Sequence, residues 1–301
     1  MNVFEFRQTL VNEYAQFTRS CTRIKADDIR AFVDAEYASQ KYWPEPLIQV
    51  NPNFQPGGSV ESLCEAGQLN PQCAEIFRFG KTASSAGQTL PLYKHQVEAI
   101  SLASAGESYV LTTGTGSGKS LSYFIPIVDA CLAARLADPT PRTRAIVVYP
   151  MNALANSQLE ELKKFLGADP DTRAVTFGRF TGQESTEERE AMKANPPDIL
   201  LTNFMMLELL LTRQNAIDQQ VIANAKGLRF LVLDELHTYR GRQGADVALL
   251  VRRVREALAD RLVCIGTSAT MATDGTEMER NAKVAEVASR LFGTKIPVTN
   301  I

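Results

Sequence analysis

The segment Thr112–Ser120, which reads Thr-Thr-Gly-Thr-Gly-Ser-Gly-Lys-Ser, constrains the fold of this chain more than any other stretch. It follows the apolar run Tyr109–Leu111 and opens an apolar helical pattern, so it joins a strand to a helix. Glycines at such a junction let backbone N–H groups surround a polyphosphate, and the helix start adds the positive end of its dipole. The segment therefore predicts a phosphate-binding loop.

Lys119 and Ser120 stand where the pattern G-x-x-x-x-G-K-[ST] requires a lysine and a hydroxyl. In such loops the lysine reaches the β and γ phosphates, and the hydroxyl is a ligand of Mg²⁺. The pattern expects glycine at position 113, where this chain has Thr113. A glycine-rich turn without a ligand is the alternative, but a lysine directly before the helix-opening serine has little structural use. The predicted nucleotide contacts in the loop are Thr115, Gly116, Ser117, Gly118, Lys119 and Ser120.

Composition indicates a soluble globular protein, since 45% of the 301 residues are hydrophobic, 22% are charged and the formal net charge is -2. No run approaches the ~18 apolar residues that a membrane span needs, and the N-terminus lacks a secretory signal, so we expect a cytoplasmic protein without membrane contact. The five cysteines are scattered and form no C-x-x-C pair, which argues against a disulfide framework or a zinc site. With so little net charge, any contact with nucleic acid must come from a local patch.

Residues 1–90 differ in pattern from residues 91–301. In the first region, apolar residues recur at three- and four-residue spacings in Leu10–Phe17 and again in Ile29–Tyr37, which predicts two amphipathic helices. Further on, Ser59 and the pair Asn70-Pro71 are typical of the caps of two short helices. We interpret this first region as a helical accessory region, an annex that packs on the rest.

In residues 91–301, short β-branched runs alternate with helical stretches of ten or more residues, which predicts an α/β fold with a mainly parallel sheet. Several runs are apolar on both faces, as the strands of a covered parallel sheet are. Ser185 followed by Glu188 predicts a capped helix start between two of them. The predicted strands are Tyr109–Thr112, Ala145–Tyr149, Val175–Phe180, Ile199–Thr202, Phe230–Asp234 and Leu262–Gly266.

Asp234 and Glu235 follow the apolar run Leu231–Leu233. An aspartate at the carboxyl end of a neighbouring strand can hold the Mg²⁺ that Ser120 contacts, while the adjacent glutamate polarises the attacking water. Carboxylates after a strand often only cap the next turn. With Lys119 and Ser120 upstream, however, the pair predicts a phosphoryl-transfer site. Its predicted catalytic residues are Lys119, Asp234 and Glu235, and its metal ligands are Ser120 and Asp234.

Three segments resemble, in order and spacing, motifs I, II and III of superfamily 2 DEAD/DEAH-box helicases: Gly116–Ser120, the Asp-Glu-Leu-His box Asp234–His237, and the Ser-Ala-Thr segment Ser268–Thr270. Tyr93–Gln96 is similar to the Q motif of these helicases, and Tyr149–Ala155 is similar to motif Ia. The resemblance implies a RecA-like lobe that binds ATP with Mg²⁺. Helicases of this superfamily commonly carry a small residue other than glycine where this chain has a threonine.

The resemblance implies roles for further residues. Gln96 would read the edges of adenine and favour ATP over GTP. His237 would link the nucleotide site to motif III, where Ser268 and Thr270 would couple hydrolysis to movement of the nucleic-acid strand. An upstream aromatic residue often stacks on the base in this family, although the candidates are equally well explained as core residues. These candidates are Phe77 and Phe79.

Nucleic-acid contacts in this family come from loops at the edge of the sheet that lies opposite to the nucleotide base. These loops hold phosphates of the nucleic acid without reading its sequence. Taken singly, each matching place in this chain is an ordinary loop or helix cap. Together, after three successive strands, these places predict one track for a single strand. The predicted contacts are Asn152, Ala153, Gln158, Gly182, Thr202 and Asn203.

The Asp-Glu-Leu-His box and the following segment Tyr239–Val247 resemble bacterial helicases of DNA repair that carry a cysteine-rich C-terminal domain, and also large helicase subunits of phage-defence systems. This chain carries no cysteine-rich domain. We therefore expect a DNA helicase or translocase whose partners are single-stranded or tailed DNA and repair or defence proteins. An RNA helicase and an ATP-gated scaffold that recruits a partner stay open as alternatives.

A motor of this superfamily has two RecA-like lobes with ATP between them. The residues after Thr270 are too few for a second lobe and its arginine finger. Such an arginine is worth ~10³ to 10⁵ in rate. We therefore expect this chain alone to hydrolyse ATP poorly, as the first lobe of a longer helicase that was cut near the linker Pro297–Ile301.

Overall fold

The structure is a computed structural model, and the chain in it divides into two compact units, residues 1–53 and residues 54–301. The residues that it describes are 2–21, 23–39, 54–82, 85–114, 116–167, 173–259, 261–269 and 275–301.

The smaller unit contains the two predicted amphipathic helices, α1 (Val3–Ser20) and α2 (Asp27–Ala38), which confirms that prediction. Arg19 at the end of α1 lies 3.7 Å from a carboxylate oxygen of Asp34 and 4.7 Å from the ring centre of Tyr37 on α2. Neither helix contains a buried residue. Within the described residues, this unit therefore has no apolar core of its own.

The larger unit is built on a six-stranded sheet with the strand order β5-β10-β9-β6-β8-β7. Every pair of neighbouring strands in it is parallel, which confirms the predicted α/β fold. All six predicted strands are present, with ends shifted by up to two residues. The strands are β5 (Tyr109–Leu111), β6 (Ala145–Tyr149), β7 (Phe177–Phe180), β8 (Ile199–Asn203), β9 (Phe230–Leu233) and β10 (Val263–Thr267).

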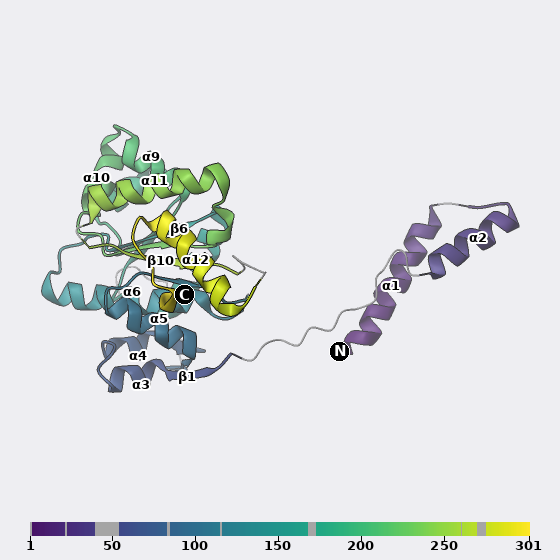
Figure 1. Cartoon of the computed structure of the whole chain (residues 1–301), viewed down its shortest axis with the longest axis horizontal. Coiled ribbons are helices and arrows are strands. Elements are labelled where there is room, and N and C mark those ends of the chain that lie inside the picture. Colours follow the sequence, from purple (N-terminus) through teal and green to yellow (C-terminus); the bar gives the residue numbers. More distant parts are fainter. Residues whose placement is uncertain are drawn as a thin grey trace. The chain divides into compact units, whose positions relative to one another are not determined.

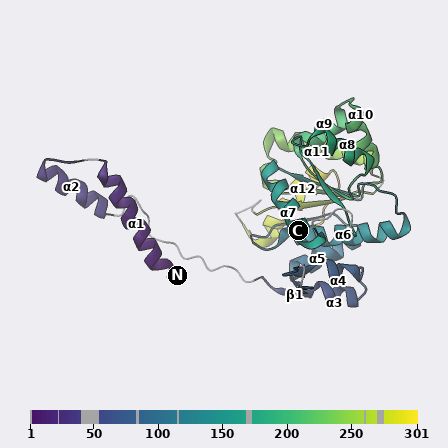
Figure 2. The same ribbon diagram turned by 180° about the vertical axis from the view of Figure 1, so that it is seen from behind.

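Helices cover both faces of the sheet, because alternate residues of each strand point to opposite faces. On β6, Ala145, Val147 and Tyr149 belong to one apolar cluster, and Ile146 and Val148 belong to the other. The first cluster holds α5 (Lys94–Ser104), α6 (Lys119–Ala137) and α7 (Asn152–Leu166). The second cluster, on the far side of the sheet in Figures 1 and 2, holds α9 (Phe204–Thr212), α10 (Ala216–Asn224), α11 (Gly241–Leu258) and α12 (Glu277–Phe292).

Helix α6 is long and apolar enough to span a membrane by length and composition alone. Ten of its residues are buried in the larger unit, including Tyr123 and Phe124. Their burial accounts for the apolar composition, since a helix enclosed by protein on most sides needs apolar residues on most sides.

Residues 54–90, which the sequence pattern grouped with the N-terminal region, contribute Val60, Leu63 and Phe77 to the same apolar cluster as α6. The predicted caps are present there: Ser59 caps α3 with a capping box, and Pro71 precedes α4. The capping box of Ser185 and Glu188 also starts α8 (Thr186–Ala194) as predicted. The elements of residues 54–93 are β1 (Pro56–Ser59), α3 (Val60–Glu65), α4 (Gln72–Ile76), β2 (Arg78–Phe79), β3 (Gln88–Thr89) and β4 (Pro91–Tyr93).

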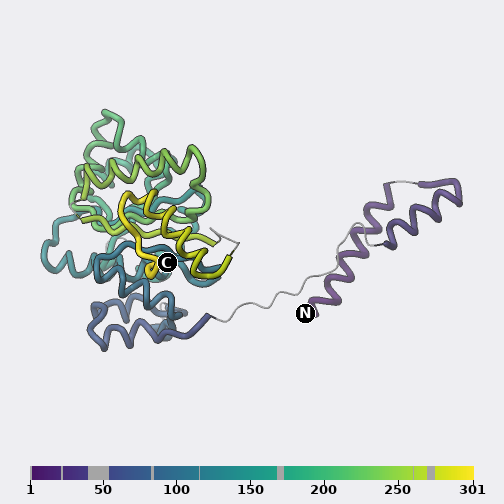
Figure 3. Tube along the Cα trace, viewed as in Figure 1, coloured from purple at the N-terminus to yellow at the C-terminus, as the bar shows by residue number. Residues whose placement is uncertain are grey.

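The carboxyl ends of the six parallel strands meet at one edge of the sheet, so the segments that follow them gather there. The strand order divides this edge into a nucleotide half, formed by β5, β10 and β9, and a loop half, formed by β6, β8 and β7. At the opposite end of the strands, Asn300 in η3 (Val298–Asn300) donates to Glu107 and to the carbonyl of Ser108, which holds the last residues beside the start of β5 (Figure 3).

Candidate active site

The predicted phosphate loop connects β5 to α6, as the sequence pattern requires. Gly116 and Gly118 have φ values of 80° and 69°, in the left-handed region that favours glycine. Gly118 is also the N-cap of α6. The loop therefore ends on the positive end of a helix dipole, with backbone N–H groups that α6 itself does not use.

Lys119 lies over this loop. Its Nζ donates to the carbonyl oxygens of Thr113, at 2.9 Å, and Gly114, at 3.0 Å. The Thr113 hydroxyl lies 2.7 Å from the Ser117 hydroxyl, so the residue that departs from the glycine pattern braces the loop. Thr115, another predicted contact, lies outside the described residues.

Gln96 is hydrogen-bonded to the end of the phosphate loop. The side chain is buried, and its Nε2 donates to the Gly118 carbonyl at 2.9 Å while its Oε1 accepts from the Tyr93 N–H at 2.8 Å. A Cβ atom on Gly118 would lie 2.6 Å from Nε2 of Gln96, so this contact needs glycine. The adenine contact predicted for Gln96 stays a prediction.

Three aromatic rings lie together beside the loop: Tyr93 and His95 of the segment matched to the Q motif, and Phe54, for which the sequence predicted no role. Tyr93 and His95 stack with ring centres 5.7 Å apart, and Phe54 lies 5.2 Å and 5.5 Å from them. Nε2 of His95 lies 3.1 Å from the Ser117 carbonyl, and burial lowers the pKa of His95. Of the predicted stacking candidates, Phe77 is buried in the core and Phe79 is exposed.

A cavity of 620 Å³ opens on the same side of the loop. Its lining includes Thr112 and Thr113 of the loop, His95 and Glu98 of α5, and Asn281 of α12. Its lining also includes Asn300 and Ile301 but neither Lys119 nor Ser120, so the cavity adjoins only the start of the loop.

Asp234 follows β9 directly, and β10 lies between β9 and β5, the strand that leads into the phosphate loop. Its Oδ1 accepts a hydrogen bond from the hydroxyl of Thr267, the last residue of β10. Burial raises the pKa of Asp234 and the charge of Glu235 adds to the effect, whereas the Thr267 hydrogen bond and the charge of Lys119 oppose it.

Glu235 has a φ of 53°, and it is the one residue other than glycine with positive φ in the part of the chain that the structure describes. Its backbone N–H lies 3.2 Å from Oγ1 of Thr267. The turn leads β9 into the short helix η2 (Leu236–Thr238) and brings a carboxylate oxygen of Glu235 within 3.2 Å of Nδ1 of His237.

His237 also lies 3.3 Å from the hydroxyl of Ser268, measured from Nδ1 to Oγ. Ser268 donates its backbone N–H to the carbonyl of Leu111, the residue that ends β5, at 2.8 Å. The structure thus brings together Glu235, His237 and Ser268, which the sequence placed in two separate motifs. Thr270, also predicted for the coupling, lies outside the described residues.

Ser120 and Asp234 are the predicted Mg²⁺ ligands. Near them, burial raises the pKa of the Tyr123 hydroxyl and the charge of Asp234 adds to the effect. A carboxylate and a hydroxyl suit Mg²⁺, which prefers oxygen ligands and takes few of them from protein when phosphates supply the rest. The described residues hold no cluster of three or more His, Cys, Asp or Glu side chains.

In the loop half, the predicted nucleic-acid residues are joined to one another. Nδ2 of Asn203 donates to Oδ1 of Asn152 at 2.7 Å and to the carbonyl of Thr181 at 3.2 Å. Oδ1 of Asn203 accepts from the N–H of Met206 and so caps α9. Asn203 therefore connects the loops after β8, β6 and β7.

At two of the predicted contacts, protein groups already use the atoms in question. Thr202 is fully buried, and its hydroxyl donates to the carbonyl of Phe180 at 2.6 Å. The N–H of Gly182 donates to Oε2 of Glu184 at 2.8 Å. Both residues hold the loop half in shape instead of presenting these groups to a ligand. Of the two remaining predicted contacts, Ala153 is exposed and Gln158 is half-buried.

Glu184 organises the loop after β7, a role that the sequence did not reveal. Its carboxylate is buried and accepts from the N–H and hydroxyl of Thr181 and from Nε of Arg179, all at 2.8 to 2.9 Å. Burial favours the neutral acid, but the hydrogen bonds from Thr181 and Gly182 outweigh it and hold the pKa of Glu184 below its ordinary value. An anion in a ring of N–H donors is the arrangement that a phosphate would also need.

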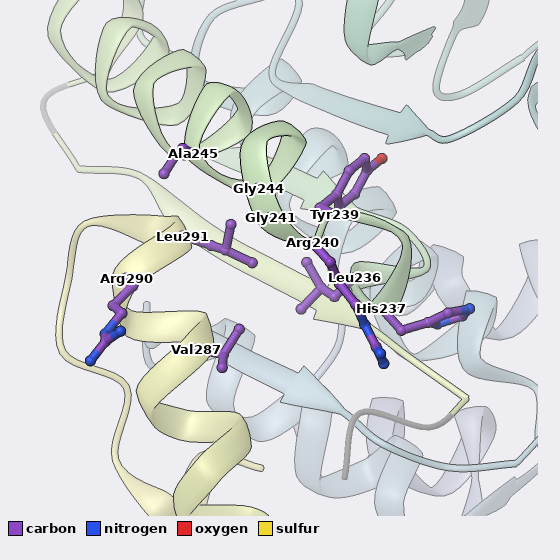
Figure 4. A pocket seen from close by; sticks show the side chains of 11 residues that line it. Leu236, His237, Tyr239, Arg240, Gly241, Gly244, Ala245, Val287, Arg290 and Leu291 are labelled. Atoms are coloured by element: carbon purple, nitrogen blue, oxygen red, sulfur yellow. The ribbon is translucent and has the colours of Figure 1, made fainter.

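A pocket of 490 Å³ lies beside the Asp-Glu-Leu-His box, between the start of α11 and α12. Figure 4 shows Leu236, Val287 and Leu291 around it, with the side chains of Arg240 and Arg290 at its margins. Its lining includes His237 but neither Lys119 nor Ser120. This pocket is therefore distinct from the phosphate loop.

Comparison with known proteins agrees with this geometry. The family model for the DEAD/DEAH box helicases matches residues 93–278. The ATP-dependent helicase hrq1 of Schizosaccharomyces pombe is 33% identical over 73% of this chain and 19% of its own length. The Druantia protein DruE of Escherichia coli is 25% identical over 82% of this chain and 19% of its own length. The DUF1998 helicase MrfA, solved with DNA and AMPPNP, matches with a TM-score of 0.58 and 25% identity over 87% of this chain and 33% of that one.

The chain thus spans about a fifth of the length of these two curated relatives. The family match contains the phosphate loop, the Asp-Glu-Leu-His box and the Ser268 segment, the three places that the fold gathers at the nucleotide half. On the sequence match and this common geometry, the chain belongs to the DEAD/DEAH box helicases of superfamily 2.

Proposed function

We propose that this chain is the ATP-binding lobe of an ATP-dependent DNA helicase or translocase. The observation that carries the proposal is the meeting of Lys119, Asp234 and Glu235 with the His237–Ser268 contact at one half of the sheet edge, beside a second half that ends in polar loops. A pure phosphate-binding domain would have no need for this combination.

In the proposed reaction, Lys119 leaves the carbonyls of Thr113 and Gly114 and pairs with the β and γ phosphates. Ser120 and Asp234 would hold Mg²⁺, which neutralises phosphate charge when it is bound. Glu235 would accept a proton from the attacking water. A movement of His237 in response to the γ phosphate would reach Ser268 through the contact between these two side chains.

The loop half would hold a DNA backbone through Asn152 and nearby backbone groups, with Asn203 holding the three loops together. These groups carry no charge, so they would position a strand without reading its sequence. Two relatives support DNA over RNA, since MrfA and a mycobacterial Lhr helicase were solved with DNA. We propose DNA repair or anti-phage defence as the pathway, with cytoplasmic location and repair or defence proteins as partners.

The described residues form one RecA-like sheet. We propose that an arginine from a second lobe completes the site, because such an arginine contributes ~10³ to 10⁵ in rate. On this proposal, the isolated chain binds ATP but turns it over slowly.

Equilibrium binding tests the proposal directly. Fluorescent ATP is expected to bind with Mg²⁺ and to be displaced by ATP better than by GTP. Single-stranded DNA and RNA of the same sequence are then compared as competitors for the loop half. The DNA is expected to bind more tightly than the RNA. Equal competition by RNA would favour an RNA helicase lobe, and failure to bind ATP at all would contradict the proposal.

The scaffold alternative is distinguished by Glu235→Gln. This variant should keep nucleotide binding but lose biological activity if hydrolysis matters. Full activity of Glu235→Gln in the cell would favour an ATP-gated scaffold.

A further inference from the structure

Thr267 contacts both halves of the catalytic carboxylate pair. It is the last residue of β10 and is fully buried. Its hydroxyl donates to Oδ1 of Asp234 and lies 3.2 Å from the backbone N–H of Glu235, from which it accepts. A hydroxyl has one proton to donate and two lone pairs to accept with, so these two bonds settle the orientation of its O–H.

The backbone that Thr267 holds is strained. Glu235 has φ 53° and ψ 56°, a conformation that residues with a side chain rarely adopt. On the other side of this residue, Thr238 donates to the Glu235 carbonyl from its N–H at 2.9 Å and from its hydroxyl at 2.8 Å. Thr267 and Thr238 therefore clamp Glu235 from opposite sides. Without such contacts, a residue of this type would relax out of the left-handed region.

We propose that Thr267 is a positioning residue that holds Asp234 in place for Mg²⁺ and holds Glu235 in place for the attacking water. This inference rests on the proposed ATP-binding function. Since the next residue, Ser268, contacts His237, Thr267 and Ser268 together touch the Asp-Glu-Leu-His box at Asp234, Glu235 and His237. A shift of β10 would move both carboxylates together.

The test compares Thr267→Val, which keeps the shape of the side chain and removes both hydrogen bonds, with Thr267→Ser, which keeps the hydroxyl. Thr143→Val is the matched control: Thr143 is also buried, but its hydroxyl donates to the carbonyl of Pro197, away from the carboxyl edge. For each variant of the 301-residue chain, AMP-PNP affinity is measured with Mg²⁺ and with EDTA. The ratio of the two affinities is the Mg²⁺ gain.

Thr267→Val is expected to lose ~10 to 100-fold of the Mg²⁺ gain, as is typical when a partner of a metal ligand is removed. Its affinity in EDTA should stay at the wild-type level, because Lys119 and the phosphate loop are unchanged. Thr267→Ser and Thr143→Val should keep the Mg²⁺ gain. A merely structural role of Thr267 would lower both affinities together, or neither.

A wild-type Mg²⁺ gain in folded Thr267→Val would overturn the inference and leave the proposed function standing. An equal loss in Thr143→Val would also overturn it. If the wild-type chain itself shows no Mg²⁺ gain, the proposed function fails, and the inference fails with it. Should Thr267→Val not fold, Thr267→Ala removes the same two hydrogen bonds without adding apolar contact, and the same outcomes apply to it.

Discussion

The two halves of the sheet edge share one architecture and treat their polar groups in opposite ways. In the nucleotide half, three charged residues, Lys119, Asp234 and Glu235, follow the strands, with a raised pKa at Asp234 and a strained backbone at Glu235. In the loop half, Glu184, Asn203 and Thr202 bond almost entirely to other protein groups. On the proposed function, the charged groups of the nucleotide half act on the ligand, whereas the polar groups of the loop half hold the loops in their shape.

This difference fits the forces that each ligand would supply. A nucleotide with Mg²⁺ concentrates charge on a few atoms, so its site needs charged groups that are only partly satisfied beforehand. A nucleic-acid backbone spreads its charge along many phosphates, so a rigid row of neutral donors is enough to position it. The comparison leads to four predictions, from the largest expected effect to the smallest.

Lys119→Ala should impair ATP binding in the nucleotide half and leave the loop half unaffected. Loss of a charged partner to phosphate costs about 2 to 5 kcal/mol, so ATP affinity should fall by at least about 30-fold in a fluorescence titration. Binding of single-stranded DNA without nucleotide should stay unchanged. Lys226→Ala, at an exposed lysine before β9, is the control. A parallel loss of DNA binding in Lys119→Ala would show that the halves are not separate.

Glu184→Gln should weaken the loop half at neutral pH. Hydrogen bonds to a charged group contribute about 1.5 to 3 kcal/mol, and the free energy of unfolding should fall by an amount in this range. The pKa of Glu184 is lowered in the folded protein, so its contribution is present above the ordinary carboxyl pKa and is lost as pH falls through the folded pKa. Urea denaturation over a pH series should show wild type and variant converging in acid.

Glu188→Gln is the control for Glu184→Gln, since Glu188 is exposed and glutamine can also complete the capping box. Its effect should stay below about 0.5 kcal/mol, as is usual for surface changes. Equal stability losses in the two variants would mean that Glu184 has no special place in the loop half.

Asn152→Ala should reduce the affinity for single-stranded DNA modestly. Loss of one neutral hydrogen bond costs about 0.5 to 1.5 kcal/mol, or roughly a 3- to 10-fold change in Kd. The salt dependence should not change, because no charge is removed. ATP affinity should stay at the wild-type value. A drop in ATP affinity with unchanged DNA binding would contradict this prediction, because Asn152 would then act in the nucleotide half and not in the loop half.

Phe17→Ser should have the smallest effect, because it changes an exposed residue of α1 in the other compact unit. The unfolding free energy of the larger unit should change by less than about 0.5 kcal/mol, and ATP affinity should not change. Calorimetry that showed a loss above about 1 kcal/mol would contradict this expectation.

Sequence patterns were sufficient for the strands, the phosphate loop and the Asp-Glu pair, because each has a local signal. Apolar runs define the strands, and glycine followed by Lys119-Ser120 defines the loop. Thr267 and Glu184 have no such signal. A threonine at the end of a strand and a glutamate in a polar loop are common, and only the partners brought by other strands give these two a role.

The same reason explains why the bonding of Thr202 and Gly182 could not be predicted. Thr202 and Gly182 have the residue types of phosphate contacts, but whether their donors are free depends on Phe180 and Glu184, which neighbouring loops supply. The aromatic rings of Phe54, Tyr93 and His95 also come together only in the folded chain.

The sequence by itself determined the order of the elements, the α/β class and the residues able to carry phosphoryl-transfer chemistry, since these depend on neighbours along the chain. The tertiary structure decided which of them meet. Along the chain the strands run from β5 to β10. In the sheet, however, β10 lies next to β5 and β9 lies next to β10, while β6, β8 and β7 form the other half. Crossover connections reorder the strands, so that residues more than a hundred positions apart share one edge.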